Sequence, residues 1–335
     1  MNSLLFYGFL ISFALSSFLL ILGIPILRKM KAGQNIREDG PKTHLKKQGT
    51  PTMGGIIILI GFSIPFIILS KIYLDLNFNQ IMMFLFPIYI YLIIGFIDDL
   101  LIIINKNNKG ITPFHKIIMQ ILGVLLYYIL FLKDYNTIVD LYYIEVDFKK
   151  MYFLFVLLIF LSSTNAVNLT DGLDGLASGL LIISLIGVVL ISLLKERLDI
   201  VLFSVCTIAS LMAFLIFNHN PALIFMGNAG SLMFGAMLGN LMILIEEEML
   251  LLIIGIVFLI ETLSVIIQVT YFKITKGKRV FLMAPIHHHF EKQGMNELTV
   301  DLLLWLIGLI SIILLFMVVI KWFYFLEWVN LIIVF

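Results

Sequence analysis

Charge and cysteine are what this chain has least of. Only 13% of its 335 residues are Asp, Glu, Lys or Arg, against about a quarter in a typical soluble domain. The single cysteine, Cys206, lies inside an apolar run, so no intrachain disulfide can form. The net charge of +1 gives no indication of a nucleic-acid partner, and we expect none.

Long hydrophobic runs take the place of charge. Hydrophobic residues make up 61% of the chain, and the mean hydropathy is +1.10. The runs are too long for the alternating strands of a membrane barrel, which are about ten residues each. The sequence therefore predicts an all-α integral membrane protein, a single polytopic domain over residues 1–335. The first run has no preceding basic residue and no small-residue cleavage site, so we expect it to be retained as a span.

The apolar runs define ten predicted spans, and the basic residues orient them. The predicted spans are 3–27, 52–70, 81–97, 117–132, 151–167, 176–194, 200–217, 231–245, 249–271 and 299–320. One set of alternate loops holds 15 of the 22 Lys and Arg residues, which makes that face cytoplasmic and both termini periplasmic. Every unusual polar cluster falls on the same face, so we expect the active-site loops and the substrate to be cytoplasmic.

The segment Asn168–Leu176 places an amide, a hydroxyl, two carboxylates and two glycines between two apolar runs. A charged residue at a bilayer centre costs roughly 3 kcal/mol, so such a cluster belongs at a membrane face or in a wet cavity. Asp171 and Asp174 would share one helix face, but the glycines weaken a helix there. We interpret the segment as a polar loop that runs into a helix start.

Asp98 and Asp99 follow directly after the third predicted span. Neighbouring carboxylates can share a cation or push their pKa values apart, so that one acts as a base. They could also simply mark the membrane interface. Their combination with Asp171 and Asp174 on the same face favours a functional role.

The segment Arg37–Gly55 is first basic, then rich in turn residues, and then opens a span. Basic side chains and glycine-exposed amides suit a phosphate-bearing ligand. For Lys46 and Lys47 an ordinary membrane anchor is at least as good an explanation. The pair Gly54-Gly55 is not explained by an anchor.

The segment Pro285–Phe290 contains three consecutive histidines beside a basic loop. Three consecutive residues of a helix cannot all face one ion, so the run is poor evidence for zinc. Contact with an anion is the better interpretation, and at least one ring has the alternative of a scaffolding role.

Two further features stand out. The loop 218–231 is polar and carries Phe225, which could stack on a base, although packing in the core is its default role. Glu261 lies inside the ninth predicted span, where we expect a structural hydrogen bond to Gln268 or to a neighbouring helix rather than catalysis.

Together these segments resemble the phospho-N-acetylmuramoyl-pentapeptide-transferase family, within the polyprenyl-phosphate N-acetylhexosamine-1-phosphate transferase superfamily. The resemblance covers nearly the whole chain. The aspartate motifs are common to the superfamily, whereas the triple histidine points to the muramoyl-pentapeptide branch. The matching segments are Gly40–Gly55, Gly95–Asp99, Asn168–Ala177, Asn218, Pro221–Ala222, Phe225–Gly227, Arg279 and Met283–Phe290.

The resemblance implies a Mg²⁺-dependent enzyme of the bacterial inner membrane. It would transfer phospho-N-acetylmuramoyl-pentapeptide from its UDP carrier to undecaprenyl phosphate, giving lipid I and UMP. Asp98 would deprotonate or orient the lipid phosphate with Asp99 beside it, and His287 would contact the pyrophosphate region. The implied substrate-binding residues are Lys42, Thr52, Lys116, Asn168, Asp171, Asp174, Asn218, Phe225, His288 and His289. A homodimer is compatible with the resemblance.

One position departs from the family pattern. Family members carry Asp after the Met-Gly pair, where it resembles a Mg²⁺ ligand beside Asp98 and Asp99, and this chain has Asn228. An amide oxygen still coordinates Mg²⁺ but brings no charge, so we expect a weaker metal site.

Three alternatives stay open at this point. The chain could transfer another UDP-linked amino-sugar phosphate, which donor selectivity would reveal. It could be a secondary transporter, although its carboxylates cluster at one face rather than at the midplane. It could also be a weakened nucleotide-sugar-binding protein because of Asn228.

Overall fold

The computed structural model describes residues 2–29, 47, 49–105, 110–141 and 144–334, except the side chains of residue 2 and residues 318–334. Its helical elements are α1 (Asn2–Lys29), α2 (Gly54–Tyr73), α3 (Phe78–Asn105), α4 (Pro113–Tyr127), η2 (Tyr128–Leu132), η3 (Lys149–Met151), α5 (Tyr152–Thr170), α6 (Leu176–Leu194), α7 (Leu198–Asn218), α8 (Gly227–Ile245), η4 (Glu248–Leu250), α9 (Leu251–Ile254), α10 (Ile256–Ile274), α11 (Ile286–Lys292) and α12 (Glu297–Val334). The strands β1 (Ile138–Asp140) and β2 (Glu145–Asp147) form an antiparallel hairpin in which Val139 pairs with Val146.

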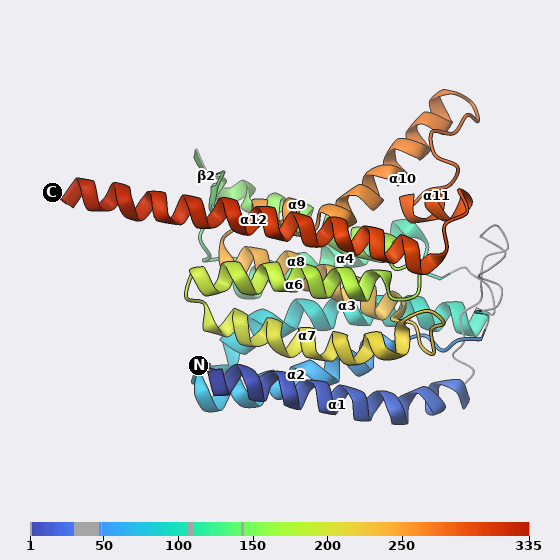
Figure 1. Cartoon of the computed structure of the whole chain (residues 1–335), viewed down its shortest axis with the longest axis horizontal. Helices are drawn as coiled ribbons and strands as arrows, with labels where there is room; N and C mark the ends of the chain where they lie inside the picture. Colours follow the sequence, from blue (N-terminus) through green and yellow to red (C-terminus); the bar gives the residue numbers. More distant parts are fainter. Residues whose placement is uncertain (1, 30–46, 48, 106–109, 142–143, 335) are drawn as a thin grey trace.

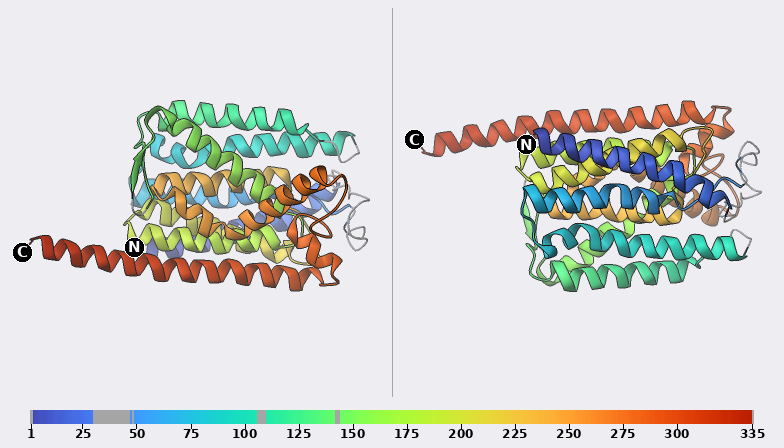
Figure 2. Two further views of the ribbon diagram at one scale, coloured as in Figure 1. Left: turned by 90° about the horizontal axis from the view of Figure 1, so that it is seen from above. Right: turned by 90° about the horizontal axis from the view of Figure 1, so that it is seen from below.

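Ten helices of the described chain are long and apolar enough to cross a membrane, which confirms the predicted number of spans. They lie roughly side by side, and the two termini mark the same end of the bundle (Figure 1). The opposite end, called here the site end, carries α11 and the loop 219–226 (Figures 1 and 2). α10 leans away from the other helices toward that end (Figure 1).

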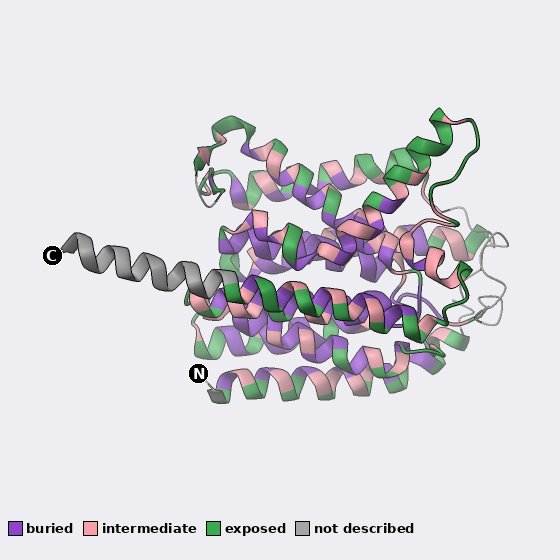
Figure 3. Ribbon diagram, turned by 45° about the horizontal axis from the view of Figure 1, so that its top comes forward, coloured by how far each residue is buried: buried purple, intermediate pink, exposed green. Residues whose placement is uncertain are grey.

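α8 forms the centre of the bundle. In the apolar stretch of α8 that could cross a membrane, 94% of the residues are buried, against 22% in α1 and 28% in α10. Figure 3 shows the same gradient, with buried residues on the inner helices and exposed residues on the outer ones. Exposed apolar side chains on the outer helices suit contact with lipid, because lipid chains are as apolar as the residues themselves.

Glycines let α8 approach α2 and α3 closely. A Cβ atom at Gly95 of α3 would meet the backbone carbonyl of Asn228, and one at Gly55 of α2 would meet the backbone of Gly230. The Gly54-Gly55 pair, which an anchor did not explain, therefore serves helix packing. These close crossings bring the ends of α2 and α3 to the first turn of α8.

Three predicted assignments are wrong. The third span does not end before Asp98, because α3 continues to Asn105 and buries both Asp98 and Asp99 in its last turns. The ninth span is not continuous, because the helix is interrupted at Gly255 between α9 and α10. Asn168 also belongs to α5 rather than to a loop, and the turn itself comprises residues 171–175.

Candidate functional site

Asp99 caps the N-terminus of α8. Its Oδ1 atom accepts hydrogen bonds from the backbone N–H and the side-chain amide of Asn228, each at 3.0 Å. Its Oδ2 atom accepts one from the backbone N–H of Ala229, also at 3.0 Å. The first N–H groups of a helix have no partner within the helix and carry a partial positive charge, so a carboxylate is stabilised there.

Asp98 faces α4 instead. Its Oδ2 atom lies 3.1 Å from Nζ of Lys116, and its Oδ1 atom accepts a 2.6 Å hydrogen bond from the backbone N–H of Ile111. Lys116 lies in the first turn of α4, which Thr112 caps and Pro113 opens. Because Pro is preorganised for the first helical position, this local sequence fixes the start of α4 and with it the position of Lys116.

A chain of hydrogen bonds joins the two aspartates. Lys116 also donates to Oδ1 of Asn168 at 3.2 Å, and Nδ2 of Asn168 donates to Oδ1 of Asn228 at 2.7 Å. Asn168 donates further to Oγ of Ser231 at 2.8 Å. We call this set the aspartate network, and it consists of Asp98, Asp99, Lys116, Asn168, Asn228 and Ser231.

A second cluster surrounds Lys47. Its Nζ atom lies 2.7 Å from Oδ1 of Asp174 and 2.6 Å from Oε2 of Glu297. Asp174 also accepts a hydrogen bond from the backbone N–H of Ala222, and Asn220 donates to Glu297. Lys47 thus ties the start of α12 to the turn 171–175 and the loop 219–226, so it is more than a membrane anchor.

Asp171 lies between the two clusters and is half-buried. Burial raises the pKa of Asp171 to about 7, and the negative charges of Asp99 and Asp174 add to the effect. Its carboxylate accepts no hydrogen bond from the residues that the structure describes. Asp171 is therefore a carboxylate available to a ligand or a proton.

His287 is fully buried at the start of α11. Its Nδ1 atom lies 3.0 Å from Oε2 of Glu261 on α10. Its Nε2 atom packs against Gly172, and within the described part of the chain it has no hydrogen-bond partner. Glu261 therefore bonds to a neighbouring helix, as expected, and the alternative partner Gln268 is wrong because Gln268 bonds to the backbone of residues 280 and 281 instead.

The other two histidines point elsewhere. Nδ1 of His288 lies 2.7 Å from Oε2 of Glu291. Nδ1 of His289 accepts a hydrogen bond from the backbone N–H of Leu282 at 3.1 Å, which is a scaffolding contact. The three rings have three different partners, in agreement with the expectation that they do not share one ion.

Three predicted substrate-binding residues lie on the segments around the start of α8. Thr52 is buried, and its hydroxyl lies with Asp99 against Gly227, whose φ of +75° requires a glycine. Asn218 fixes the loop, since it accepts from Ser178 at 2.9 Å and donates to the carbonyl of Ile224 at 2.9 Å. Phe225 is half-buried, and its backbone pairs with residues 51 and 54. Lys42 lies outside the described residues.

The oxygen atoms of Asp98, Asp99 and Asn228 are the candidates for a metal ligand set. Hard cations such as Mg²⁺ prefer oxygen, so the ligand type fits. Within residues 49–105, 110–141 and 144–317, no three carboxylate, imidazole or thiol side chains are grouped to hold one ion. The fit therefore depends on Asn228 as the third oxygen donor.

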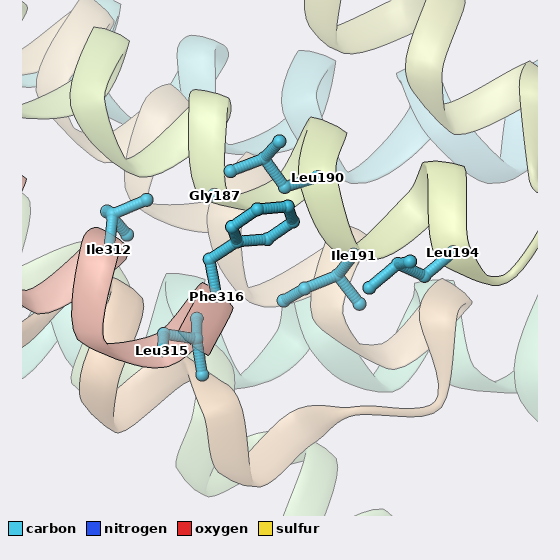
Figure 4. Close-up of a pocket in the computed structure, with 7 residues that line it drawn as sticks. All are labelled: Gly187, Leu190, Ile191, Leu194, Ile312, Leu315 and Phe316. Carbon is cyan, nitrogen blue, oxygen red and sulfur yellow. The ribbon is translucent and has the colours of Figure 1, made fainter. Parts of the chain in front are cut away.

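One hydrophobic pocket is visible at a distance from this chemistry. It lies between α6 and α12, toward the end of α6 remote from the site end, and its lining includes Leu190, Ile312 and Phe316 (Figure 4). All seven lining residues are apolar or glycine, so the pocket offers no group for catalysis.

The chain matches the family model for glycosyl transferase family 4 over residues 81–246, and signature 1 of phospho-N-acetylmuramoyl-pentapeptide-transferase over residues 47–59. It is 45% identical over 294 residues to the phospho-N-acetylmuramoyl-pentapeptide-transferase of Staphylococcus saprophyticus, covering 86% of this chain and 91% of the relative. The chain belongs to the phospho-N-acetylmuramoyl-pentapeptide-transferase family. The relatives of that name from Bacillus subtilis and Listeria monocytogenes are 41% and 40% identical, over 92% of this chain and 94% and 97% of their own lengths.

Family membership confirms the resemblance seen in the sequence. The matched signature begins at Lys47, the residue at the centre of the second cluster. Sequence reasoning did not select Lys47 as a site residue, although its position two residues before the Gly-Thr-Pro-Thr segment was the available signal. It also gave no indication of Glu297, whose partners lie far away in the sequence.

Proposed function

We propose that this phospho-N-acetylmuramoyl-pentapeptide-transferase family member transfers phospho-N-acetylmuramoyl-pentapeptide from its UDP carrier to undecaprenyl phosphate. The products are lipid I and UMP. The observation that carries the proposal is the identity of 40–45% to relatives of that name over most of both chains. The aspartate network at one end of the bundle supports it, because a reaction between two phosphates needs both carboxylates and cationic groups.

Asp98 is the group that accepts a proton from the lipid phosphate or orients it. Its Oδ2 atom forms an ion pair with the ammonium of Lys116. The ammonium therefore holds the carboxylate in place and offsets its repulsion of an incoming phosphate. Asp99 is fixed by three N–H groups and so positions the first turn of α8. The lipid phosphate, which is the nucleophile, therefore approaches groups that are already held in place.

The donor lies between the aspartate network and the cluster around Lys47. Asn168, Asp171, Asp174, Asn218 and Phe225 come from α5, the turn after it and the loop 219–226, which converge at the site end. In this proposal Phe225 stacks on the uracil. The remaining residues of the proposed donor site are Lys42, Thr52, His287, His288 and His289.

Mg²⁺ belongs to this proposal, held by oxygen atoms of Asp98, Asp99 and Asn228. When bound, the ion would neutralise charge on the phosphates during transfer. The polar site end faces the cytoplasm and both termini face the periplasm, in the bacterial inner membrane, because the basic residues favour that orientation. A homodimer is part of the proposal, and mass measurement of the detergent-solubilised protein tests it.

The test is release of UMP by the purified protein with undecaprenyl phosphate and a panel of UDP-linked donors. We expect Mg²⁺-dependent release with the muramoyl-pentapeptide donor and none with UDP-N-acetylglucosamine. Release with the simpler donor would favour a related sugar-phosphate transferase. Donor binding without release would favour a nucleotide-sugar-binding protein.

A further inference from the structure

The side-chain amide of Asn228 makes two hydrogen bonds within the aspartate network, one through its nitrogen and one through its oxygen. The Nδ2 atom donates to Oδ1 of Asp99 at 3.0 Å, and the Oδ1 atom accepts from Nδ2 of Asn168 at 2.7 Å. We propose that this amide takes the place of a resident divalent cation, so that Mg²⁺ enters the site only together with the anionic donor. The second half of this inference rests on the proposed function.

The hydrogen bonds of the two aspartates support the inference. Asp99 accepts three N–H groups, of which the Asn228 amide is one. Asp98 accepts the backbone N–H of Ile111 and the ammonium of Lys116. Each of the four carboxylate oxygens therefore already accepts a proton donor, and a cation would have to compete with these donors.

Most of the negative charge of the network is also offset without a metal. Two carboxylates face one ammonium and the N-terminus of α8, which carries about half a positive charge. A carboxylate at position 228 would add a negative charge and would remove the N–H group from Asp99. Two carboxylate oxygens at the 3.0 Å that now separates the amide from Asp99 repel each other unless a proton or a cation lies between them.

Binding of a cation between Asp99 and Asn228 requires the amide to turn. Rotation of the amide would present Oδ1 to the ion. It would also break the hydrogen bond from Nδ2 to Asp99 and the hydrogen bond from Asn168 to Oδ1. A neutral oxygen also attracts a divalent cation less than a carboxylate does. The protein alone should therefore bind the ion weakly, whereas a pyrophosphate that already carries Mg²⁺ supplies the missing negative charge.

The experiment uses Mn²⁺ as the probe and does not depend on turnover. Electron paramagnetic resonance reports free Mn²⁺ in a titration of the purified full chain without nucleotide. We expect Asn228→Asp to bind one Mn²⁺ at least about tenfold more tightly than the unchanged chain, because a carboxylate replaces an amide that donates to Asp99. Tight, stoichiometric Mn²⁺ binding by the unchanged chain without nucleotide would overturn the inference.

Thermal unfolding gives a second readout. With EDTA, Asn228→Asp should unfold at a lower temperature than the unchanged chain, and Mg²⁺ should restore it, whereas the unchanged chain should respond little to Mg²⁺. Asn165→Asp is the matched control. Asn165 lies one turn before Asn168 on α5, and its amide donates to Gln120 rather than to a carboxylate. An equal response to Mg²⁺ in both variants would contradict a specific role for position 228.

The role of the donor is tested by adding UDP-N-acetylmuramoyl-pentapeptide to the Mn²⁺ titration. Uptake of Mn²⁺ by the protein–donor complex but not by the protein alone supports entry with the donor. UMP release without such uptake overturns entry with the donor and leaves the proposed function standing. Weak Mn²⁺ binding by the protein alone together with no UMP release from any donor removes the proposed function but not the role of the amide.

Discussion

Nδ1 of His287 lies 3.0 Å from Oε2 of Glu261, and both side chains are fully buried. The two residues belong to different helices, α11 and α10, so the contact fixes the short histidine helix to a membrane-spanning one. Because the ring is held through Nδ1, its Nε2 atom is directed at Gly172, next to Asp171. Glu261 therefore positions His287.

Removal of Glu261 should cost both stability and activity. In Glu261→Ala the buried ring loses its partner, at a cost of about 3 kcal/mol, and turnover should fall at least about tenfold. Glu261→Gln keeps a hydrogen-bonding side chain of the same size and should lose less. Thermal unfolding and UMP release measure both effects. If the loss of stability in the double variant equals the sum of the losses in Glu261→Ala and His287→Ala, the two residues are not coupled.

The close approach of α3 to α8 should be sensitive to a single methyl group. In Gly95→Ala the new Cβ would meet the backbone carbonyl of Asn228, so the first turn of α8 must move away from Asp99. We expect a loss of about 1–3 kcal/mol and most of the activity. Gly308→Ala on α12 is the control, because its Cβ would meet only the ends of flexible side chains, the nearest being that of Leu180 at 3.3 Å. Equal melting temperatures for the two variants would argue against the close crossing.

Lys47 should be irreplaceable by an uncharged residue. Its ammonium lies between Asp174 and Glu297, whose side chains are 1% and 10% exposed, so Lys47→Met leaves a buried and a partly buried acid without that cation. We expect a loss of about 3 kcal/mol, because an uncompensated buried charge is costly. Lys47→Arg retains the charge and should retain most of the stability. A melting temperature unchanged by Lys47→Met would show that Lys47 is only a membrane anchor.

Asp171 should make stability depend on pH. Its pKa is raised in the folded protein to about 7 from an ordinary value of 3.8, so the folded state holds the proton more tightly than the unfolded state does. The stabilisation is complete below pH 3.8 and is lost as the pH rises toward 7. In EDTA, the melting temperature of the unchanged chain relative to Asp171→Asn should fall between about pH 5 and pH 7. If the difference in melting temperature between the two proteins does not change over this pH range, the pKa of Asp171 is not raised and its carboxylate is in contact with water.

The membrane spans were predictable from the sequence alone, because a long apolar run in a membrane can only form a helix. It gave the wrong end for the third span, since the hydropathy of residues 98–105 does not reveal that Asp98 and Asp99 are satisfied by donors from α4 and α8. The break at Gly255 was missed for a similar reason, because the residues on both sides of it are equally apolar.

Single site residues were found more readily than their partners. Asp98, Asp171 and His287 stood out because polar groups are rare in this chain. Their interactions with Lys116, Asp99 and Glu261 depend on which helices cross. The glycines that permit those crossings are informative only once the neighbouring helix is known. Lys47 was underestimated because a basic residue before a span is common in any membrane protein.

Formation of lipid I tests the central claim most directly. The unchanged chain and Asp98→Asn are placed in vesicles that contain undecaprenyl phosphate, and the labelled UDP-N-acetylmuramoyl-pentapeptide is added outside with Mg²⁺. We expect labelled lipid I from the unchanged chain and a loss of at least about a hundredfold in Asp98→Asn, because the amide cannot take a proton from the lipid phosphate. Absence of lipid I from the unchanged chain, or equal formation by both proteins, would contradict the account.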